Sequence, residues 1–245
     1  MTALIPQLKA QPRKEVVYPS GDGTPVAETF DHLYALFVTL EVLRQYLKGQ
    51  QATVLGNQFL YYAENYPRLR VAPDVMVIFG VEPGGRDRFK TWEEGASPAV
   101  VFEMTSAGTR TKDEAEKYEL YEKLGVLEYW QFDPKGEWIS DYLRGYRLID
   151  GRYQPITDSI SQVLQLTLAV EDKLIAFYVQ STGEKLLIPD EMSARLARAE
   201  QEAEQAQKKT EKAQQEAEQA QKKAEQAQKE NADLKQRLRD LGIEV

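Results

Sequence analysis

The order of apolar and polar positions predicts two helices in the first part of the chain. Residues 27–48 carry apolar side chains at helical spacing and are followed by Gly49, a residue type that often ends helices. Residues 113–124 show the same period and are followed by Gly125. Both segments are therefore expected to be amphipathic helices that pack one face on a core.

Runs rich in β-branched or aromatic residues predict strands at 53–62, 71–79, 99–104 and 128–132. A loop with a Pro-Gly-Gly sequence separates the second run from the third. Since the helix at 113–124 lies between the last two runs, these are expected to be parallel neighbours. Shorter alternating stretches with a tight turn at Asp150-Gly151 predict a flanking antiparallel part. The predicted class is α/β, with a mixed sheet core flanked by helices.

The pattern changes after Asp190, beyond which Pro, Trp, Tyr and Phe are absent. The segment AEQAQKK at 203–209 recurs at 217–223 and is followed by AEQAQKE at 224–230, which is a heptad repeat. Alanines occupy most a and d positions, and Asn231 falls on an a position where it could fix the register. Self-association through a coiled coil is one interpretation, and a lone solvated helix with Glu–Lys pairs is the other.

These patterns divide the chain into three parts: an N-terminal extension at 1–17, a domain at 18–189 and a heptad-patterned helix at 190–245. Hydrophobic residues make up 42% of the chain and charged residues 29%, values typical of a soluble globular protein. The chain has no cysteine, which excludes a disulfide framework and a thiolate site. Neither a signal peptide nor a long apolar run is evident, and a cytoplasmic location is expected.

The net charge of −8 argues against a basic nucleic-acid coat, because nonspecific phosphate binding depends on Lys and Arg. Local chemistry is more informative. Asp74 stands at the start of one apolar strand and Glu103 inside another, and a buried carboxylate must be paired, solvated or bound to a cation. If the two strands are neighbours, both carboxylates and the carbonyl of Met104 could ligate Mg²⁺ or Mn²⁺. A turn-forming role is the alternative for Asp74.

The sequence Pro73-Asp74 followed by Glu103-Met104-Thr105 resembles the PD-(D/E)XK signature of restriction-endonuclease-like nucleases. Thr105 stands where that signature has a lysine. Lys117, on the helix that follows, could supply the missing cation, although simple salt bridges with neighbouring glutamates are the alternative. Lys112 is the substitute if the helix begins at a different residue.

The longer pattern resembles the Uma-two family within that superfamily. The matching stretches are YPSGDGTPVAETFDH at 18–32, VAPDVMVIFGV at 71–81, FEMTSAGTRTKDEAEKYELYEKLGVLEYWQFDP at 102–134 and LRGYRLIDGRYQPI at 143–156. The resemblance implies the restriction-endonuclease-like α/β core and cleavage of DNA with a divalent metal. It also implies metal ligation by Asp74 and Glu103, with Lys117 as the helix-borne lysine, and an additional acidic position at Glu28.

His32 also falls on a position of this family pattern, but a lone histidine on a helix is more often structural. For contacts with substrate phosphates, the candidates are Arg86, Arg88, Lys90, Arg110 and Lys112, most of them in predicted loops. We expect four aromatic residues to pack in the core, and stacking on nucleic-acid bases is the alternative. They are Tyr118, Tyr121, Tyr129 and Trp130.

Three functions agree with these features. The first is a metal-dependent endonuclease that hydrolyses DNA, which the Asp74 and Glu103 pair favours. The second is a DNA-binding protein of the same fold with weakened catalysis, favoured by Thr105 in the lysine position. The third is an oligomeric interaction protein that acts through its C-terminal helix.

Overall fold

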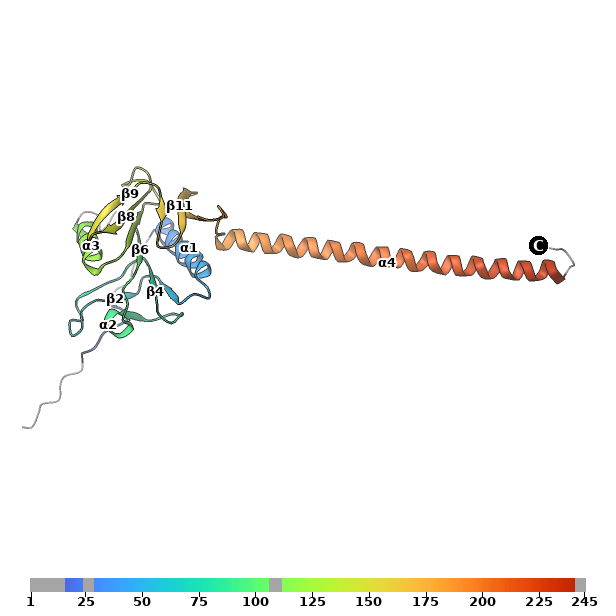
Figure 1. The fold of residues 1–245 in the computed structure, drawn as a ribbon, viewed down its shortest axis with the longest axis horizontal. Helices are drawn as coiled ribbons and strands as arrows, with labels where there is room; N and C mark the ends of the chain where they lie inside the picture. The colour runs from blue at the N-terminus through green and yellow to red at the C-terminus, as the bar shows by residue number, and fades with distance from the viewer. Residues whose placement is uncertain (1–15, 24–28, 106–111, 241–245) are drawn as a thin grey trace, which may run out of the picture. The chain divides into compact units, whose positions relative to one another are not determined.

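The computed structural model describes residues 16–23, 29–105 and 112–240, except for the side chains of residues 112–114 and 238–239. The chain divides into two compact units, Met1–Pro189 and Asp190–Val245. The first unit is a mixed α/β body, and the second consists of one long helix (Figure 1). The α/β class predicted from the sequence is confirmed.

The body is built around a six-stranded sheet in the order β1-β4-β6-β7-β8-β9. Its strands are β1 (Ala52–Leu55), β4 (Val75–Phe79), β6 (Val100–Met104), β7 (Glu128–Phe132), β8 (Leu143–Ile149) and β9 (Arg152–Ile156). Only β6 and β7 are parallel among these neighbours, as the strand-helix-strand order predicts. The turn at Asp150-Gly151 joins β8 to β9, and both turn residues have positive φ, which a tight hairpin of this kind requires.

Two three-stranded sheets flank this main sheet, in the orders β3-β2-β5 and β10-β11-β12. Their strands are β2 (Phe59–Tyr61), β3 (Arg70–Val71), β5 (Arg88–Lys90), β10 (Ile160–Ser161), β11 (Leu166–Glu171) and β12 (Leu174–Val179). The remaining helices of the body are α1 (Phe30–Tyr46), α2 (Thr91–Glu94) and α3 (Lys112–Leu124).

Two predicted strands were too long, and each is divided in the structure. The run at 53–62 is interrupted by Asn57, which has a φ of 56° and ends the pairing of β1. The run at 71–79 is interrupted at Pro73, which has no N–H to donate to a neighbouring strand. The helix predicted at 27–48 begins at Phe30, because Thr29 has extended backbone and caps the helix by accepting the N–H of His32.

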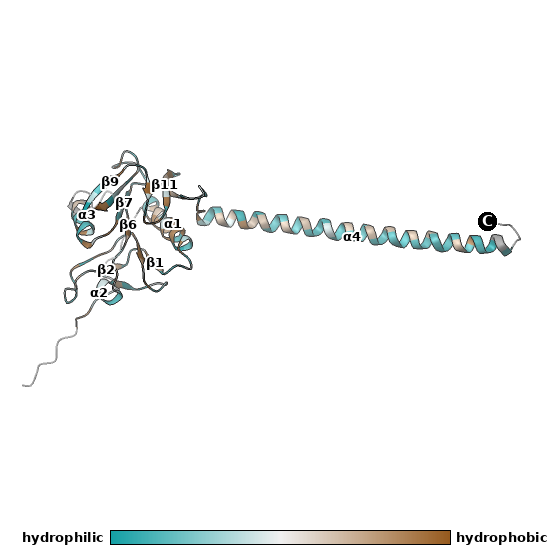
Figure 2. Cartoon of the chain, viewed as in Figure 1, coloured by the Kyte–Doolittle hydropathy of each residue, from teal (hydrophilic) through white to brown (hydrophobic). Residues whose placement is uncertain are grey.

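The two faces of the main sheet carry separate apolar cores. On one face, α1 and the β10-β11-β12 sheet pack on side chains that include Val75, Phe102 and Trp130. On the other face, α3 and the β3-β2-β5 sheet pack on side chains that include Val101 and Tyr129. Figure 1 shows α1 and α3 on opposite sides of β6, and Figure 2 shows the hydrophobic colours concentrated on the strands of the body. Alternation along each strand therefore directs neighbouring residues to different cores.

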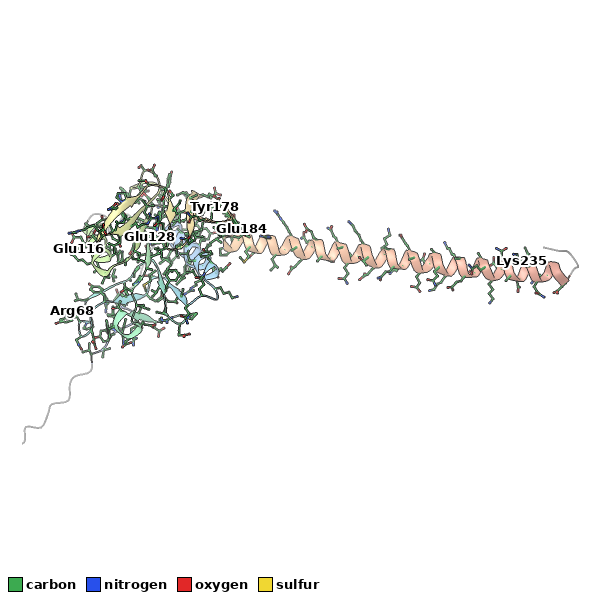
Figure 3. The ribbon with its side chains drawn as sticks, viewed as in Figure 1. Arg68, Glu116, Glu128, Tyr178, Glu184 and Lys235 are labelled. Carbon is green, nitrogen blue, oxygen red and sulfur yellow. The ribbon has the colours of Figure 1, made fainter. Side chains whose placement is uncertain are left out.

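A buried glutamate ties the β10-β11-β12 sheet to the main sheet. Glu128 on β7 is fully buried and lies within the body in Figure 3. Its carboxylate accepts hydrogen bonds from Arg147 at 3.2 Å and from the backbone N–H of Gln162 at 2.8 Å, and the hydroxyl of Ser161 also donates to it. These donors offset the cost of burying the charge, so the role of Glu128 is structural.

The second unit is α4 (Pro189–Asp240), a helix of 52 residues. From Met192 to Arg237 every side chain is exposed, including those of Leu196 and Leu234 on the heptad seam. Ion pairs one turn apart, such as Lys208 with Glu204, line its surface. A long helix is thus present, while its pairing into a coiled coil stays a prediction. None of the helices in the described part of the chain is long and apolar enough to cross a membrane.

We expect Gly145→Ala to destabilise the body by about 1–3 kcal/mol, the usual cost of adding volume to a packed core. Gly145 pairs with Trp130, and a Cβ at this position would lie 2.5 Å from two atoms of the indole ring. Gly85→Ala is the control, because a Cβ there meets nothing within 4 Å, and its effect should stay within about 0.5 kcal/mol. Chemical denaturation measures both, and equal midpoints for the two variants would contradict this packing.

Candidate active site

Asp74 and Glu103 lie next to each other at one end of the β4–β6 pair. The two strands are antiparallel, with Val75 opposite Phe102, so one further residue places Asp74 opposite Glu103. Asp74 is tied to the neighbouring strand directly, because its Oδ2 accepts the backbone N–H of Met104 at 2.7 Å. The structure therefore brings together the two carboxylates that the sequence singled out.

The backbone of Asp74 is held by the turn that ends β1. The N–H of Asn57 donates to two backbone carbonyls, that of Pro73 at 3.0 Å and that of Asp74 at 3.1 Å. Gly56 leaves room for this close approach, since a Cβ there would lie 3.2 Å from the Asp74 carbonyl and 3.0 Å from the Leu40 side chain. The break in the predicted strands is thus what sets the position of this carboxylate.

Glu103 is buried, with 5% of the residue exposed, and α3 supplies two donors to it. Lys117 Nζ lies 2.9 Å from its Oε2, and the Tyr121 hydroxyl donates to its Oε1 at 2.6 Å. Burial raises the pKa of Glu103 to about 7, opposed by the charge of Lys117, while the nearby Asp74 raises it further and the hydrogen bonds from Tyr121 and Lys117 lower it. The carboxylate is consequently fixed in orientation but costly to keep ionised.

The cation beside Glu103 is Lys117 of α3. Thr105 instead makes hydrogen bonds to the backbone of β7. The Thr105 hydroxyl donates to the carbonyl of Phe132 at 3.3 Å, and its N–H donates to the same carbonyl at 2.7 Å. Lys117 and Tyr121 are one turn apart on α3, so a single helix face delivers both contacts to Glu103.

His32 lies on the other side of Asp74. Its Nε2 is 3.7 Å from Asp74 Oδ1, and the residue is buried in the first turn of α1. This approach places the imidazole of His32 beside the carboxylate of Asp74. His32 is therefore a neighbour of the Asp74 carboxylate, and its structural role stays a prediction.

The donor set suits a hard divalent cation in its chemistry. The Asp74 and Glu103 carboxylates and the Met104 carbonyl would offer oxygen donors, the kind that Mg²⁺ and Mn²⁺ prefer. The burial and mutual repulsion that raise the Glu103 pKa are relieved by an added positive charge. In the part of the chain that the structure describes, no group of three or more His, Asp or Glu side chains could hold a metal by itself. Glu28, the further acidic candidate, lies outside the described residues.

The residues predicted to contact phosphates take part in other contacts or lie outside the described residues. Arg86 binds Glu94 through two hydrogen bonds of 2.7 and 2.9 Å and stabilises its own loop. We predicted that Arg88 and Lys90 lie in a loop. They lie instead in β5, which pairs with β2. Lys90 also contacts Glu93 at 2.7 Å. Arg110 and the side chain of Lys112 lie outside the described residues.

Sequence reasoning missed two residues in the same row as the carboxylates. Glu103 pairs with Gln131 on β7, and Gln131 pairs with Arg144 on β8. We refer to Asp74, Glu103, Gln131 and Arg144 as the polar row. The signal available in the sequence was a polar glutamine within the aromatic-rich strand segment EYWQF at 128–132.

Most of the aromatic residues serve packing, as we expected. Tyr118 packs against Tyr129, Tyr146 and Tyr153 with ring centroids 5.0 to 6.5 Å apart. Tyr121 is the exception in function, because its hydroxyl contacts Glu103.

The chain is similar to a known protein family and to a solved structure. A family model, Uma2, described as "Putative restriction endonuclease", matches residues 5–177, which is more than half of the chain. The chain belongs to the Uma2 family. One similar solved structure is a putative nuclease of the DUF820 family from Anabaena variabilis, with 14% identity, a TM-score of 0.45, and coverage of 63% of this chain and 87% of that one. No curated protein matches this Uma2 chain.

The raised pKa of Glu103 predicts how the stability of the metal-free Uma2 protein depends on pH. Its pKa rises from an ordinary value of 4.5 to about 7 on folding. Between these values the folded state holds a proton that the unfolded chain releases, so this contribution is complete below pH 4.5 and is lost as the pH rises through 7.

Chemical denaturation with a chelator present, from about pH 4.5 to about pH 8, measures this loss. We expect the free energy of unfolding of Glu103→Gln to fall less than that of the wild type over this range, because the amide cannot ionise. Parallel curves for the two proteins would show that Glu103 is not buried as described.

Proposed function

We propose that this protein is a divalent-metal-dependent endonuclease that hydrolyses phosphodiester bonds of DNA. The observation that carries the proposal is the arrangement around Glu103, which lies opposite Asp74 and 2.9 Å from the ammonium of Lys117. Two carboxylates and a lysine at one end of a strand pair form the minimal set for metal-assisted phosphodiester hydrolysis. Membership of the Uma2 family supports the same reaction class.

The proposed roles follow from the contacts. Asp74 and Glu103, with the Met104 carbonyl, would hold Mg²⁺ or Mn²⁺, which when bound lowers the pKa of a water and polarises the phosphate. Lys117 places a positive charge beside the same carboxylate, where it can stabilise negative charge that develops on the phosphate.

The surrounding contacts keep the reacting groups in place. The Tyr121 hydroxyl holds Glu103, and the Met104 N–H holds Asp74. A site in which each ligand is already oriented loses little free energy to reorganisation when metal and substrate bind. With a net charge of −8, attraction of DNA would depend on the bound cation and on local basic residues.

A second candidate is a DNA-binding protein of the same fold with weakened cleavage. It is favoured by Thr105, whose hydroxyl donates to the Phe132 carbonyl and brings no cation to the strand end. The two candidates differ in whether Lys117 replaces the missing lysine in catalysis as well as in position.

We expect the purified protein to cut circular or single-stranded DNA in Mg²⁺ or Mn²⁺, and a chelator to abolish cleavage. Glu103→Gln, Asp74→Asn and Lys117→Met should each lower the rate by about 100-fold or more, the scale of losing one preorganised charge in an active site. The measurement is the initial rate of plasmid nicking.

Lys123→Met is the matched control for Lys117→Met. Lys123 lies on the same helix, pairs only one turn away with Glu119 and is largely exposed, so its loss should leave the rate unchanged. A wild type that binds DNA without cutting it would favour the second candidate. Equal cutting by wild type and Glu103→Gln would show that the site is assigned wrongly.

We also propose that α4 mediates self-association. Its exposed heptad seam, with Leu196 and Leu234 near its two ends, supports pairing with a second copy of this chain. Alanines between them allow close approach of two helices but bury little area each, so the association is expected to be weak.

Charges placed on the seam should therefore dissociate the full-length protein. We expect the double variant Ala213→Glu, Ala220→Glu, at two d positions, to sediment at a lower mass than the wild type. The control carries the same two charges at f positions, as Gln201→Glu, Gln215→Glu, and should keep the wild-type mass. If all three proteins sediment as monomers, α4 is a lone helix.

A further inference from the structure

We propose that the pocket between α3 and β3 binds a nucleotide of the DNA strand near the scissile bond, with Arg70 contacting its phosphate and Tyr62 stacking on its base. This inference rests on the proposed function and assigns the substrate contact that the sequence-based candidates do not provide. Both residues lie outside the two carboxylates and the lysine of the candidate active site.

The pocket shares Lys117 with the candidate active site. Its volume is about 410 Å³; α3 lines one side, and Tyr62 and the two residues of β3 line the other. The ammonium of Lys117 is 2.9 Å from Glu103. Arg70 is four residues before Asp74, so their Cα atoms are at most about 14 Å apart. A strand with about 3.4 Å of helix axis per nucleotide covers that distance in about four nucleotides.

The guanidinium of Arg70 is held by aromatic residues. Its Cζ lies 4.1 Å from the centre of the Phe59 ring and 5.9 Å from that of Tyr61, and its Nη1 donates to the Tyr61 hydroxyl at 3.2 Å. Tyr61 is fully buried, and its hydroxyl in turn donates to the carbonyl of Pro19 at 2.6 Å. These partners are neutral, so they orient the guanidinium and leave its charge in place.

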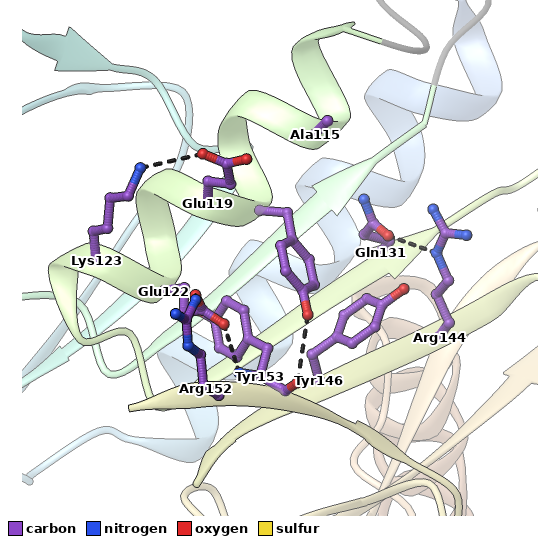
Figure 4. A pocket seen from close by; sticks show the side chains of 10 residues that line it. Ala115, Glu119, Glu122, Lys123, Gln131, Arg144, Tyr146, Arg152 and Tyr153 are labelled. Atoms are coloured by element: carbon purple, nitrogen blue, oxygen red, sulfur yellow. Dashed lines mark hydrogen bonds and ion pairs between the residues drawn. The ribbon is translucent and has the colours of Figure 1, made fainter. Parts of the chain in front are cut away.

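Arg70 differs in this respect from the two lysines of the pocket. The ammonium of Lys117 contacts the buried carboxylate of the candidate site, and Lys123 pairs with Glu119 at 3.2 Å on α3 (Figure 4). Among the residues that the structure describes, no carboxylate pairs with Arg70. Because Glu116 and Glu119 are both on the α3 side, repulsion favours a phosphate on the β3 side, beside Arg70.

Tyr62 brings an aromatic ring to the same pocket. It follows β2 directly and is partly exposed, and within the described part of the chain its ring packs on no other aromatic ring. A ring in this position accepts any base by stacking, and a guanidinium contacts a phosphate regardless of sequence. The ligand class is therefore a nucleic-acid strand recognised by its backbone and base faces.

Binding of a single-stranded DNA oligonucleotide to the full-length protein in Ca²⁺ tests the phosphate contact. We expect Arg70→Met to weaken binding roughly tenfold, the scale of one lost charged hydrogen bond, and to reduce the slope of log affinity against log salt by about 0.7. Methionine keeps an apolar side chain next to Phe59, so the variant should fold. A loss of affinity with an unchanged salt slope would assign Arg70 to packing and overturn the proposal.

Two further variants control for charge. Arg70→Lys should keep the salt slope but bind more weakly than the wild type, because lysine retains the charge and loses the planar contact with Phe59. Arg68, labelled in Figure 3, is exposed, lies two residues before Arg70 and is not among the residues that line the pocket. Arg68→Met should therefore leave affinity and slope close to the wild-type values, and an effect equal to that of Arg70→Met would refute a specific contact.

The stacking contact has its own pair of variants. Tyr62→Leu should weaken binding of the oligonucleotide roughly tenfold, the scale of one lost base–aromatic stack, and leave the salt slope unchanged because no charge is removed. Tyr62→Phe keeps the ring and should bind like the wild type. Equal affinities for Tyr62→Leu and the wild type would remove Tyr62 from the pocket's role.

Cleavage in Mg²⁺, measured beside binding, separates this inference from the proposed function. If the wild type binds DNA but does not cut it, and Arg70→Met loses affinity and salt slope, the nucleotide pocket stands and the endonuclease proposal fails. If the wild type cuts DNA and Arg70→Met matches it in affinity and slope, the phosphate contact is refuted. A wild type that does not bind DNA refutes both.

Discussion

The burial of one carboxylate, that of Glu103, is the constraint on which the rest of the candidate site depends. A glutamate in the centre of an apolar strand cannot be ionised cheaply, and its pKa of about 7 expresses that cost. Lys117 and Tyr121 offset part of it, while Asp74 adds to it. In its ionised form such a group is stable in the fold only if positive charge stays close by. The same requirement makes the position suitable for a divalent cation.

Strand topology explains why those partners are available. Because β6 and β7 are parallel, the chain must cross the face of the sheet between them, and α3 is that crossover. The crossover passes above Glu103 and delivers Lys117 and Tyr121 from a single helix face. Asp74 reaches the same point from the other neighbour, β4, which is antiparallel to β6. Glu103 therefore lies where three elements meet.

The opposite face of the same sheet serves stability. Glu128 is also a buried carboxylate on β7, but its partners are Arg147 and the Ser161-Gln162 segment of the flanking sheet. These donors, which include the guanidinium of Arg147, satisfy the hydrogen-bonding capacity of the carboxylate. Glu128 therefore does not need a bound metal ion. Two buried glutamates in adjacent strands thus have different roles, and the difference lies in which face of the sheet each one occupies.

Much of this arrangement could be read from local patterns. Patterns among residues close together in the sequence predict the helices and strands, the tight turn at Asp150-Gly151 and the heptads after Asp190. Asp74 and Glu103 were recognisable because a charge in an apolar strand needs a reason. The apolar stripe of α1 was a poorer guide, since Leu33 and Phe37 are exposed while His32 and Thr39 are buried.

The sequence by itself therefore determined the class of the fold, the long C-terminal helix and the two carboxylates around which a site could form. Only the tertiary structure decided that Lys117 lies beside Glu103, and that Gln131 and Arg144 extend the same row. The physical reason is that periodicity records which side of an element is apolar. Contacts across strands depend instead on which strands become neighbours and in what register, and residues distant in the sequence set both.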